Sequence, residues 1–317
     1  MLSTAGIGVL VYALIQAPVA GWASAQTLGL AAVVLTIGAA FVTVERRRSQ
    51  PMLDLRLFGD ARFAAASATI TIAFFALAGF IFLITQYFHF VRGYGPLDTG
   101  VRLLPVAASV AAGSIVGTLL AVRHGTKVVV TSGLLSLTAA YTWISATGAG
   151  TTYTEIVGQM LLLGSGMGLT SAPATESIMG AVTRGKAGIG SAMNDATREL
   201  GGTLGVAVIG SVYASLYAHA LRGPELGGVP VAAVTSARDS IGAALLTADR
   251  LGDPAGATLS NAAVEGFFDG LQTGCLVAAG VCATGALLAM IALPSQPTTA
   301  HPSRAGIAGQ PLSDPGA

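Results

Sequence analysis

Residues 103–122 have the sequence LLPVAASVAAGSIVGTLLAV, a run of twenty residues without a charged side chain. An α-helix rises about 1.5 Å per residue, so such a run crosses the roughly 30 Å hydrocarbon layer of a bilayer. Two further uncharged runs, 128–154 and 271–291, are at least as long. The pattern predicts an all-α integral membrane protein.

The composition of the whole chain supports this prediction. Hydrophobic residues make up 53% of the 317 residues, charged residues only 10%, and the mean hydropathy is +0.71. A soluble globular domain carries about 25% charged residues. The net charge of +1 gives no electrostatic basis for binding nucleic acid. The apolar runs also lack the alternation of polar and apolar residues that strands of a membrane barrel require.

The apolar runs predict about eight transmembrane helices. They are expected near 2–19, 27–44, 63–91, 101–122, 127–147, 154–182, 189–220 and 263–293. We divide the chain into two leading helices with a basic loop (1–62), a six-helix bundle (63–293) and a tail (294–317). Within the bundle, the connection 222–262 is rich in Gly, Pro, Asp and Ala, and short interfacial helices are expected around 231–248. The proline-rich tail is expected to be disordered.

The distribution of basic residues between the loops predicts the orientation. One set of alternate loops, together with the tail, carries ten: Arg46, Arg47, Arg48, Arg56, Arg62, Arg123, Lys127, Arg184, Lys186 and Arg304. The opposite loops carry five: Arg92, Arg102, Arg222, Arg238 and Arg250. By the positive-inside rule the first set faces the cytoplasm, which places both termini there. Trp22, Tyr94, Trp143 and Tyr153 fall near the expected interfaces, where aromatic side chains anchor helices.

Five segments carry a family resemblance through their order and spacing. They are Gly21–Leu30, Glu45–Phe58, Thr85–Pro105, Gly164–Pro173 and Asn194–Ala207. In this arrangement the chain resembles the C-terminal half of the fourteen-helix drug:proton antiporters of the EmrB/QacA type, in the major facilitator superfamily. The resemblance covers residues 1 to about 293, apart from the long loop.

The resemblance implies that the chain corresponds to helices seven to fourteen and lacks the first six-helix bundle. It implies export of lipophilic or cationic compounds across the plasma membrane in exchange for protons, with no cofactor beyond the proton gradient. The partners implied are the bilayer and a second half-transporter or a second copy. The loop 123–127 departs from the pattern, because it retains only part of the superfamily's Gly-Asp-Arg loop and has no Asp.

Two other functions compete with a transporter. A non-transporting fragment, or a regulatory module that docks on another transporter, would have the same composition. The hypothesis of a membrane-embedded enzyme has the least support, because the chain has no HExxH or GxSxG motif and no His/Cys cluster. Cys275 and Cys282 lie about 10 Å apart on one helix, too far for a disulfide, and no third ligand suggests a metal.

Ionisable groups inside the membrane cost roughly 2.5–3.5 kcal/mol each at mid-helix, so each calls for an explanation. Glu176 follows Pro173 within an apolar run. Apolar surroundings favour a protonated carboxyl, which suits a proton carrier. The alternative is a position near the cytoplasmic interface, paired with Arg184.

Asn194, Asp195, Arg198 and Glu199 fall near the start of the seventh span. The spacing allows Asp195 to pair with Arg198 in a capped helix start. The alternative is a gating or coupling network with the cytoplasmic loop.

Two polar positions lie near the outer ends of spans. Gln86 is a candidate ligand of a substrate cavity, while His89 next to Arg92 favours a helix end at the interface. Asp269 is expected about two turns from the outer end of the last span, either in a water-filled cavity or at headgroup depth.

Glycines recur at short intervals in three spans. The residues singled out are Gly113, Gly117, Gly164, Gly166, Gly168, Gly201, Gly202 and Gly205. Small residues four apart let helices approach closely, so tight packing is the simpler interpretation. The functional alternative is a sliding contact in a helix that moves.

Overall fold

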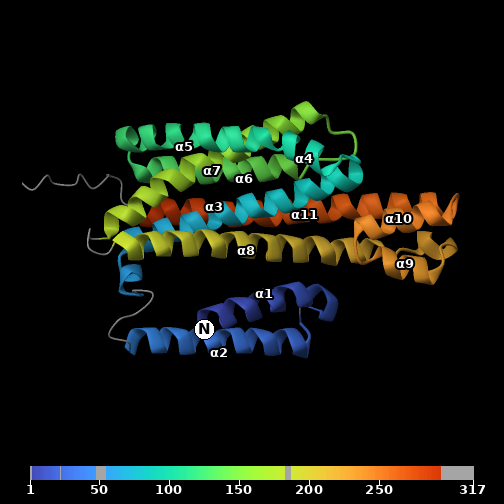
Figure 1. Ribbon diagram of the computed structural model, residues 1–317, viewed down its shortest axis with the longest axis horizontal. Helices are drawn as coiled ribbons and strands as arrows, with labels where there is room; N and C mark the ends of the chain where they lie inside the picture. Colours follow the sequence, from blue (N-terminus) through green and yellow to red (C-terminus); the bar gives the residue numbers. More distant parts are fainter. Residues whose placement is uncertain (1, 22, 48–54, 183–186, 294–317) are drawn as a thin grey trace, which may run out of the picture.

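The computed structural model describes residues 2–21, 23–47, 55–182 and 187–293. Within these ranges all regular structure is helical (Figure 1). The elements are α1 (Leu2–Ala20), α2 (Ala25–Arg47), the 3-10 turn η1 (Leu55–Gly59), α3 (Ala61–Gln86), the π-helical turn η2 (Tyr87–Val91), α4 (Pro96–Arg102), α5 (Leu104–His124), α6 (Thr126–Ile144), α7 (Tyr153–Ala181), α8 (Ala187–Ala220), the 3-10 turn η4 (Pro224–Gly228), α9 (Val231–Ala237), α10 (Ile241–Leu251) and α11 (Ala255–Ala292).

The predicted fold class is confirmed. Six helical segments of the described part are long and apolar enough to cross a membrane, namely 25–47, 61–91, 96–124, 126–144, 187–220 and 255–292. The two remaining predicted spans coincide with α1 and α7. The chain is therefore an all-α, multi-pass membrane protein.

The long connection between the last two spans contains two short helices. Helices α9 and α10 occupy the stretch where short helices were expected. The predicted start of the last span at residue 263 was wrong, because α11 begins at Ala255. Its first turns pack against α10, where Gly256 meets Ala248. The predicted disorder of the tail concerns residues outside those described.

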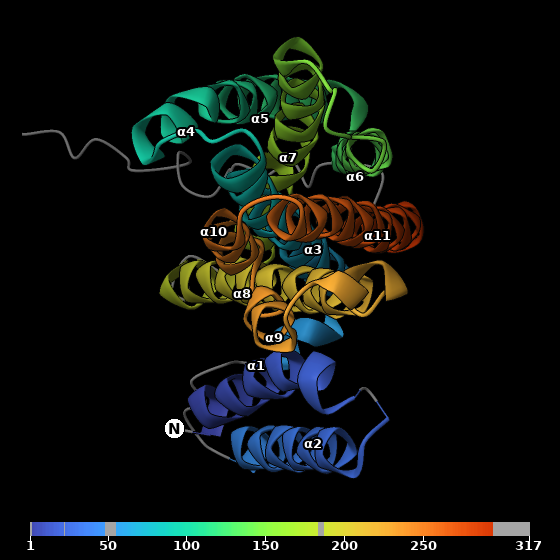
Figure 2. The same cartoon turned by 90° about the vertical axis from the view of Figure 1, so that its right-hand side faces the viewer.

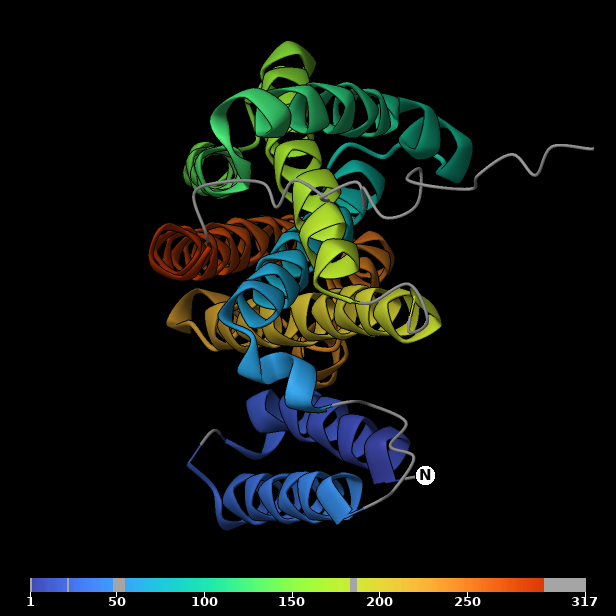
Figure 3. The same ribbon diagram turned by 90° about the vertical axis from the view of Figure 1, so that its left-hand side faces the viewer.

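The six helices α3, α5, α6, α7, α8 and α11 form one bundle (Figures 1 and 2). In this bundle α7 packs against α5 and α6, α3 packs against α8, and α11 packs against α6 and α8. The pair α1–α2 lies to one side, against α8, and reaches it through α1 (Figure 3).

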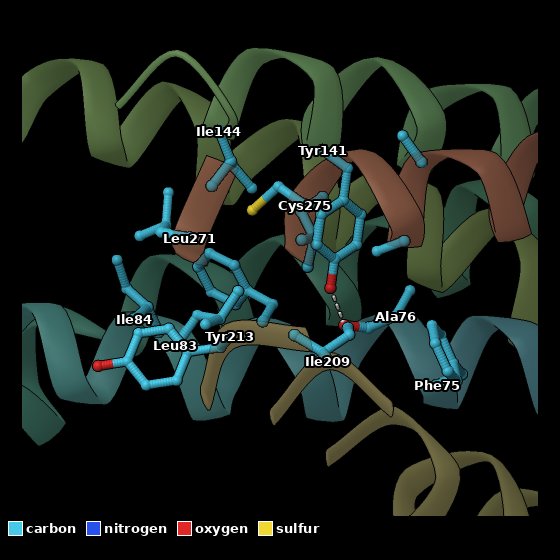
Figure 4. Close-up of a cluster of buried hydrophobic side chains, with 14 of the residues drawn as sticks. Phe75, Ala76, Leu83, Ile84, Tyr141, Ile144, Ile209, Tyr213, Leu271 and Cys275 are labelled. Atoms are coloured by element: carbon cyan, nitrogen blue, oxygen red, sulfur yellow. Dashed lines mark hydrogen bonds between the residues drawn. The ribbon is translucent and has the colours of Figure 1, made fainter. Parts of the chain in front are cut away.

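The centre of the bundle is a layer of buried apolar side chains from α3, α6, α8 and α11 (Figure 4). Tyr141 of α6 is fully buried in this layer, and its hydroxyl donates to the main-chain carbonyl of Ala76 in α3. Cys275 and Cys282 are both buried free thiols, so the sequence was right to treat them as packing residues. The layer joins helices that are far apart in sequence.

Replacing Tyr141 by Phe tests the contribution of that hydrogen bond. The ring and its packing are kept, while the hydrogen bond from the hydroxyl to the Ala76 carbonyl is lost. We expect a loss of about 0.5–1.5 kcal/mol of stability. Thermal unfolding of the purified protein in detergent measures it, and an unchanged midpoint would show that the bond contributes nothing.

The glycines at four-residue spacing lie on helix contacts. A Cβ on Gly164 would come within 2.7 Å of the Val106 carbonyl in α5, and one on Gly166 within 2.7 Å of the Gly133 carbonyl in α6. Gly168 similarly leaves no room for a Cβ against Val110 of α5. These three glycines therefore let α7 approach two neighbours at once, which supports the packing interpretation.

Candidate functional site

A buried polar cluster joins α7 and α8. Arg198 of α8 donates through Nη2 to the hydroxyl of Thr175 in α7 over 3.2 Å, and that hydroxyl donates to Oδ1 of Asn194, also over 3.2 Å. Asn194 is buried, and Arg198 and Thr175 are half-buried. We call Thr175, Asn194 and Arg198 the polar cluster.

The guanidinium of Arg198 also lies 5.2 Å from the ring centre of Phe74 in α3, a cation–π contact. Its Nε atom is buried and has no hydrogen-bond partner within the described ranges. Among the described residues the guanidinium is held by a hydroxyl and a ring rather than by a carboxylate, so a half-buried positive charge lies in the bundle without an ion-pair partner there. Such a charge is costly in a membrane protein and commonly marks a functional site.

The ion pair between Asp195 and Arg198 that the sequence suggested is not formed. Both residues lie within the described ranges, and no salt bridge joins them there. The prediction of a capped helix start at these residues is also wrong, because α8 begins at Ala187, two turns before Asp195. Asp195 and Glu199 are exposed on α8.

Glu176 follows Thr175 in α7 and is exposed five residues before the helix ends at Ala181. Its suggested partner, Arg184, lies outside the described residues. Pro173 is buried inside α7, where a proline removes one main-chain hydrogen bond of the helix. The proline therefore loosens α7 just before the residue that bonds Arg198.

An apolar groove of about 520 Å³ lies between α1, α3 and α8. It is lined by Val11, Ile15, Phe82, Thr203, Val206, Ala207, Gly210, Ser211 and Ala214. Ser211 donates from its hydroxyl to the Leu14 carbonyl of α1 and so ties the two walls together. We call this the α1–α8 groove, and its volume suits a small organic ligand.

The groove and the cluster are neighbours along α8. Glu199 precedes Thr203 by one turn, and side chains one turn apart project from the same side of a helix. The exposed carboxylate of Glu199 therefore stands near the end of an otherwise apolar groove. This combination provides apolar contact for a lipophilic body and a negative charge for a cation.

Two predicted site residues are not joined to this site. Gln86 is the half-buried last residue of α3, one turn beyond Phe82 in the groove wall. Asp269 is exposed on α11, 14 residues after the helix start at Ala255, and so lies farther from the start of its helix than the two turns expected for a span that begins at residue 263. No hydrogen bond or ion pair within the described ranges links either residue to the polar cluster.

Sequence reasoning missed several polar residues. Glu265 is exposed on α11 one turn before Asp269. The four-residue spacing could have revealed that these two acids lie on the same side of the helix. Gln159 and Thr147 are buried and bonded to each other, with 3.1 Å from Nε2 to Oγ1. Thr175 carried no signal in the sequence, because threonines are common in these helices and bond their own main chain.

Comparison with known proteins gives the site a context. The chain is 40% identical over 216 residues to the multidrug resistance protein Stp of Mycobacterium tuberculosis, which covers 68% of this chain and 40% of that protein. It is 29% identical over 305 residues to the tetracenomycin C resistance and export protein of Streptomyces glaucescens, covering 92% and 55%. It is 30% identical over 247 residues to the methyl viologen resistance protein SmvA of Salmonella typhimurium, covering 78% and 49%.

The chain is a homologue of bacterial drug resistance and efflux proteins. It spans about half the length of the curated relatives that it matches. No family model matches it. Some of these homologues are named as export or efflux proteins, in agreement with the transport function expected from the sequence.

Proposed function

We propose that the chain forms part of a proton-driven exporter of lipophilic or cationic compounds in the plasma membrane. The polar cluster and the α1–α8 groove carry the proposal, because α8 places a half-buried cation and an exposed acid within two turns of an apolar groove. The efflux proteins among its homologues support the same activity. Organic cations such as methyl viologen, named in one relative, are within the proposed substrate class.

The proposed assembly follows the resemblance to the fourteen-helix antiporters. The described bundle would correspond to helices nine to fourteen, and α1–α2 to helices seven and eight. A second six-helix bundle, from another chain or a second copy, would complete the two units that rock about a central site. The basic loops support a cytoplasmic location for both termini.

Glu199 and Glu176 are proposed to bind the proton or the cationic substrate. Both are exposed acids that directly follow a member of the polar cluster in sequence, Glu199 after Arg198 and Glu176 after Thr175. Protonation of either acid would remove the negative charge that holds a cation. The site would therefore exchange a bound cation for a proton.

Amide substitution of the acids tests this role. We expect Glu199→Gln and Glu176→Gln each to lower proton-driven efflux at least about tenfold, the effect of losing one interaction of about 1.4 kcal/mol. Asp269→Asn is the matched control, since Asp269 is an exposed acid with no link to the cluster. Efflux equal to the control in both glutamine variants would remove these acids from the mechanism.

The function itself is tested by ethidium efflux from cells that express the whole chain, with membrane-inserted protein quantified in parallel. Uncoupler-sensitive efflux is the expected result if the chain forms its own complete assembly. Co-expression with a candidate second bundle tests the assembly from two chains. Absence of efflux in both settings, despite normal insertion, would favour a regulatory module that docks on another transporter.

A further inference from the structure

Three aromatic rings lie close together at the end of the bundle that carries α4. Phe88 comes from η2, Tyr94 from the loop before α4, and Tyr153 is the first residue of α7. The ring centre of Phe88 lies 5.7 Å from that of Tyr94 and 6.4 Å from that of Tyr153. We call these three residues the aromatic cage.

Two rings of the cage, those of Tyr94 and Tyr153, contact a cation that belongs to the chain itself, while the third ring, that of Phe88, is fully buried. The guanidinium carbon of Arg102 lies 4.0 Å from the ring centre of Tyr94 and 5.9 Å from that of Tyr153. Its Nη1 atom lies 3.3 Å from Oδ1 of Asp98. The sequence indicated only interfacial anchoring for Tyr94 and Tyr153, yet both rings also contact this guanidinium.

The occupant is open to exchange. The Arg102 side chain is 31% exposed and that of Asp98 is 68% exposed, so solvent reaches the ion pair. Exposed pairs of this kind are weak. An arriving cation could therefore displace the guanidinium at little cost.

The main chain holds the cage in place without the Arg102 side chain. The Tyr153 hydroxyl donates to the main-chain carbonyl of Arg102 over 3.3 Å, an acceptor that any residue at position 102 supplies. The Tyr94 amide donates to the Phe88 carbonyl over 2.9 Å. Arg92, which donates to the Tyr87 hydroxyl over 2.7 Å and to the Thr151 carbonyl, ties η2 to the turn before Tyr153.

We propose that the aromatic cage is a binding site for organic cations and that Arg102 is its tethered competitor. Aromatic rings attract cations through the negative charge of their faces, and cages of rings recognise quaternary ammonium groups. Asp98 supplies a carboxylate beside the rings. The cage is distinct from the polar cluster, because Phe88 of η2 follows Phe74 of α3 by 14 residues, about 21 Å at the rise of an α-helix, and it is Phe74 that contacts Arg198.

Equilibrium binding of radiolabelled tetraphenylphosphonium to the whole chain in lipid nanodiscs tests the proposal. Removing the competitor with Arg102→Ala should tighten binding about threefold to tenfold, as expected when a site is freed from an occupant that fills it most of the time. Arg123→Ala is the matched control, because it removes an exposed arginine outside the cage. The neutral analogue triphenylphosphine oxide should show no gain.

The rings are tested within the Arg102→Ala background. Adding Tyr94→Leu should abolish the gain, whereas adding Tyr94→Phe should keep it, since the ring face remains. Tyr12→Leu, at an exposed tyrosine of α1, is the control for loss of a ring. Thermal unfolding of each variant identifies any that fail to fold. If the Tyr94→Leu variant does not fold, binding to the Tyr94→Phe variant decides whether the ring face is sufficient for the gain.

Three results would overturn the proposal. They are no gain in Arg102→Ala, an equal gain in Arg123→Ala, or a gain that survives Tyr94→Leu. The proposal does not depend on the proposed export. The gain is a difference between variants in binding alone, so Glu199→Gln should leave it intact even if that variant abolishes efflux.

Discussion

Gly205→Ala is expected to destabilise the protein by about 1–3 kcal/mol, the usual cost of forcing an extra carbon into a close-packed contact. A Cβ at this position of α8 would lie 2.9 Å from the Cα of Phe75 and closer still to its carbonyl oxygen. Both atoms belong to the main chain of α3, so no side-chain rotation can make room. The helices α3 and α8 must separate, and every contact along the seam weakens.

Gly202→Ala is the matched control, three residues earlier in the same helix. There a Cβ would meet only the Cβ of Ala78, at an ordinary 3.8 Å. Alanine also favours a helix over glycine, so the variant should be at least as stable as the natural protein. Thermal unfolding in detergent should separate the two variants clearly. Equal midpoints would mean that the contact between α3 and α8 can adjust to the extra carbon and does not limit the stability of the protein.

Arg198→Leu is expected to lower efflux by about tenfold to a hundredfold, the loss expected from a hydrogen bond of a charged group worth about 1.5–3 kcal/mol. The same substitution removes a costly charge from the bundle. Protein level and thermal stability should therefore be unchanged or increased. This opposition between stability and activity is the mark of a residue retained for function.

Arg198→Lys distinguishes the role of charge from that of shape. Lysine keeps the positive charge but has no planar fork to contact both Thr175 and the Phe74 ring. We expect partial recovery of efflux relative to the leucine variant. Efflux of the leucine variant at the natural level would show that Arg198 has no part in transport, and loss of folded protein would make its role structural.

The sequence predicted the helices well because a bilayer imposes length and hydropathy directly. The breaks were also visible, at Gly93, before Pro96 and at Gly125, where positive φ angles at both glycines end a helix. The early start of α11 was not. Residues 255–262 contain the small and polar residues typical of a loop, and only packing against α10 makes them helical.

The candidate site was predicted residue by residue but not as an arrangement. Helical spacing offered Asp195 as the nearest partner of Arg198, whereas the structure supplies Thr175 from another helix, 23 residues earlier. Which glycines are essential was similarly hidden. Gly201 and Gly205 meet α3, while the adjacent Gly202 projects to a looser contact.

The length of α11 has a practical consequence for imaging. Its 38 residues extend for roughly 57 Å, well beyond a bilayer, and with α9 and α10 it projects past the other helix ends (Figure 1). The projecting segment is continuous with a helix of the bundle, and Gly242 of α10 fits against Phe90 of η2. An antibody fragment bound there would serve as a rigid fiducial for electron cryomicroscopy, and its tilt would report the orientation of the bundle in each particle.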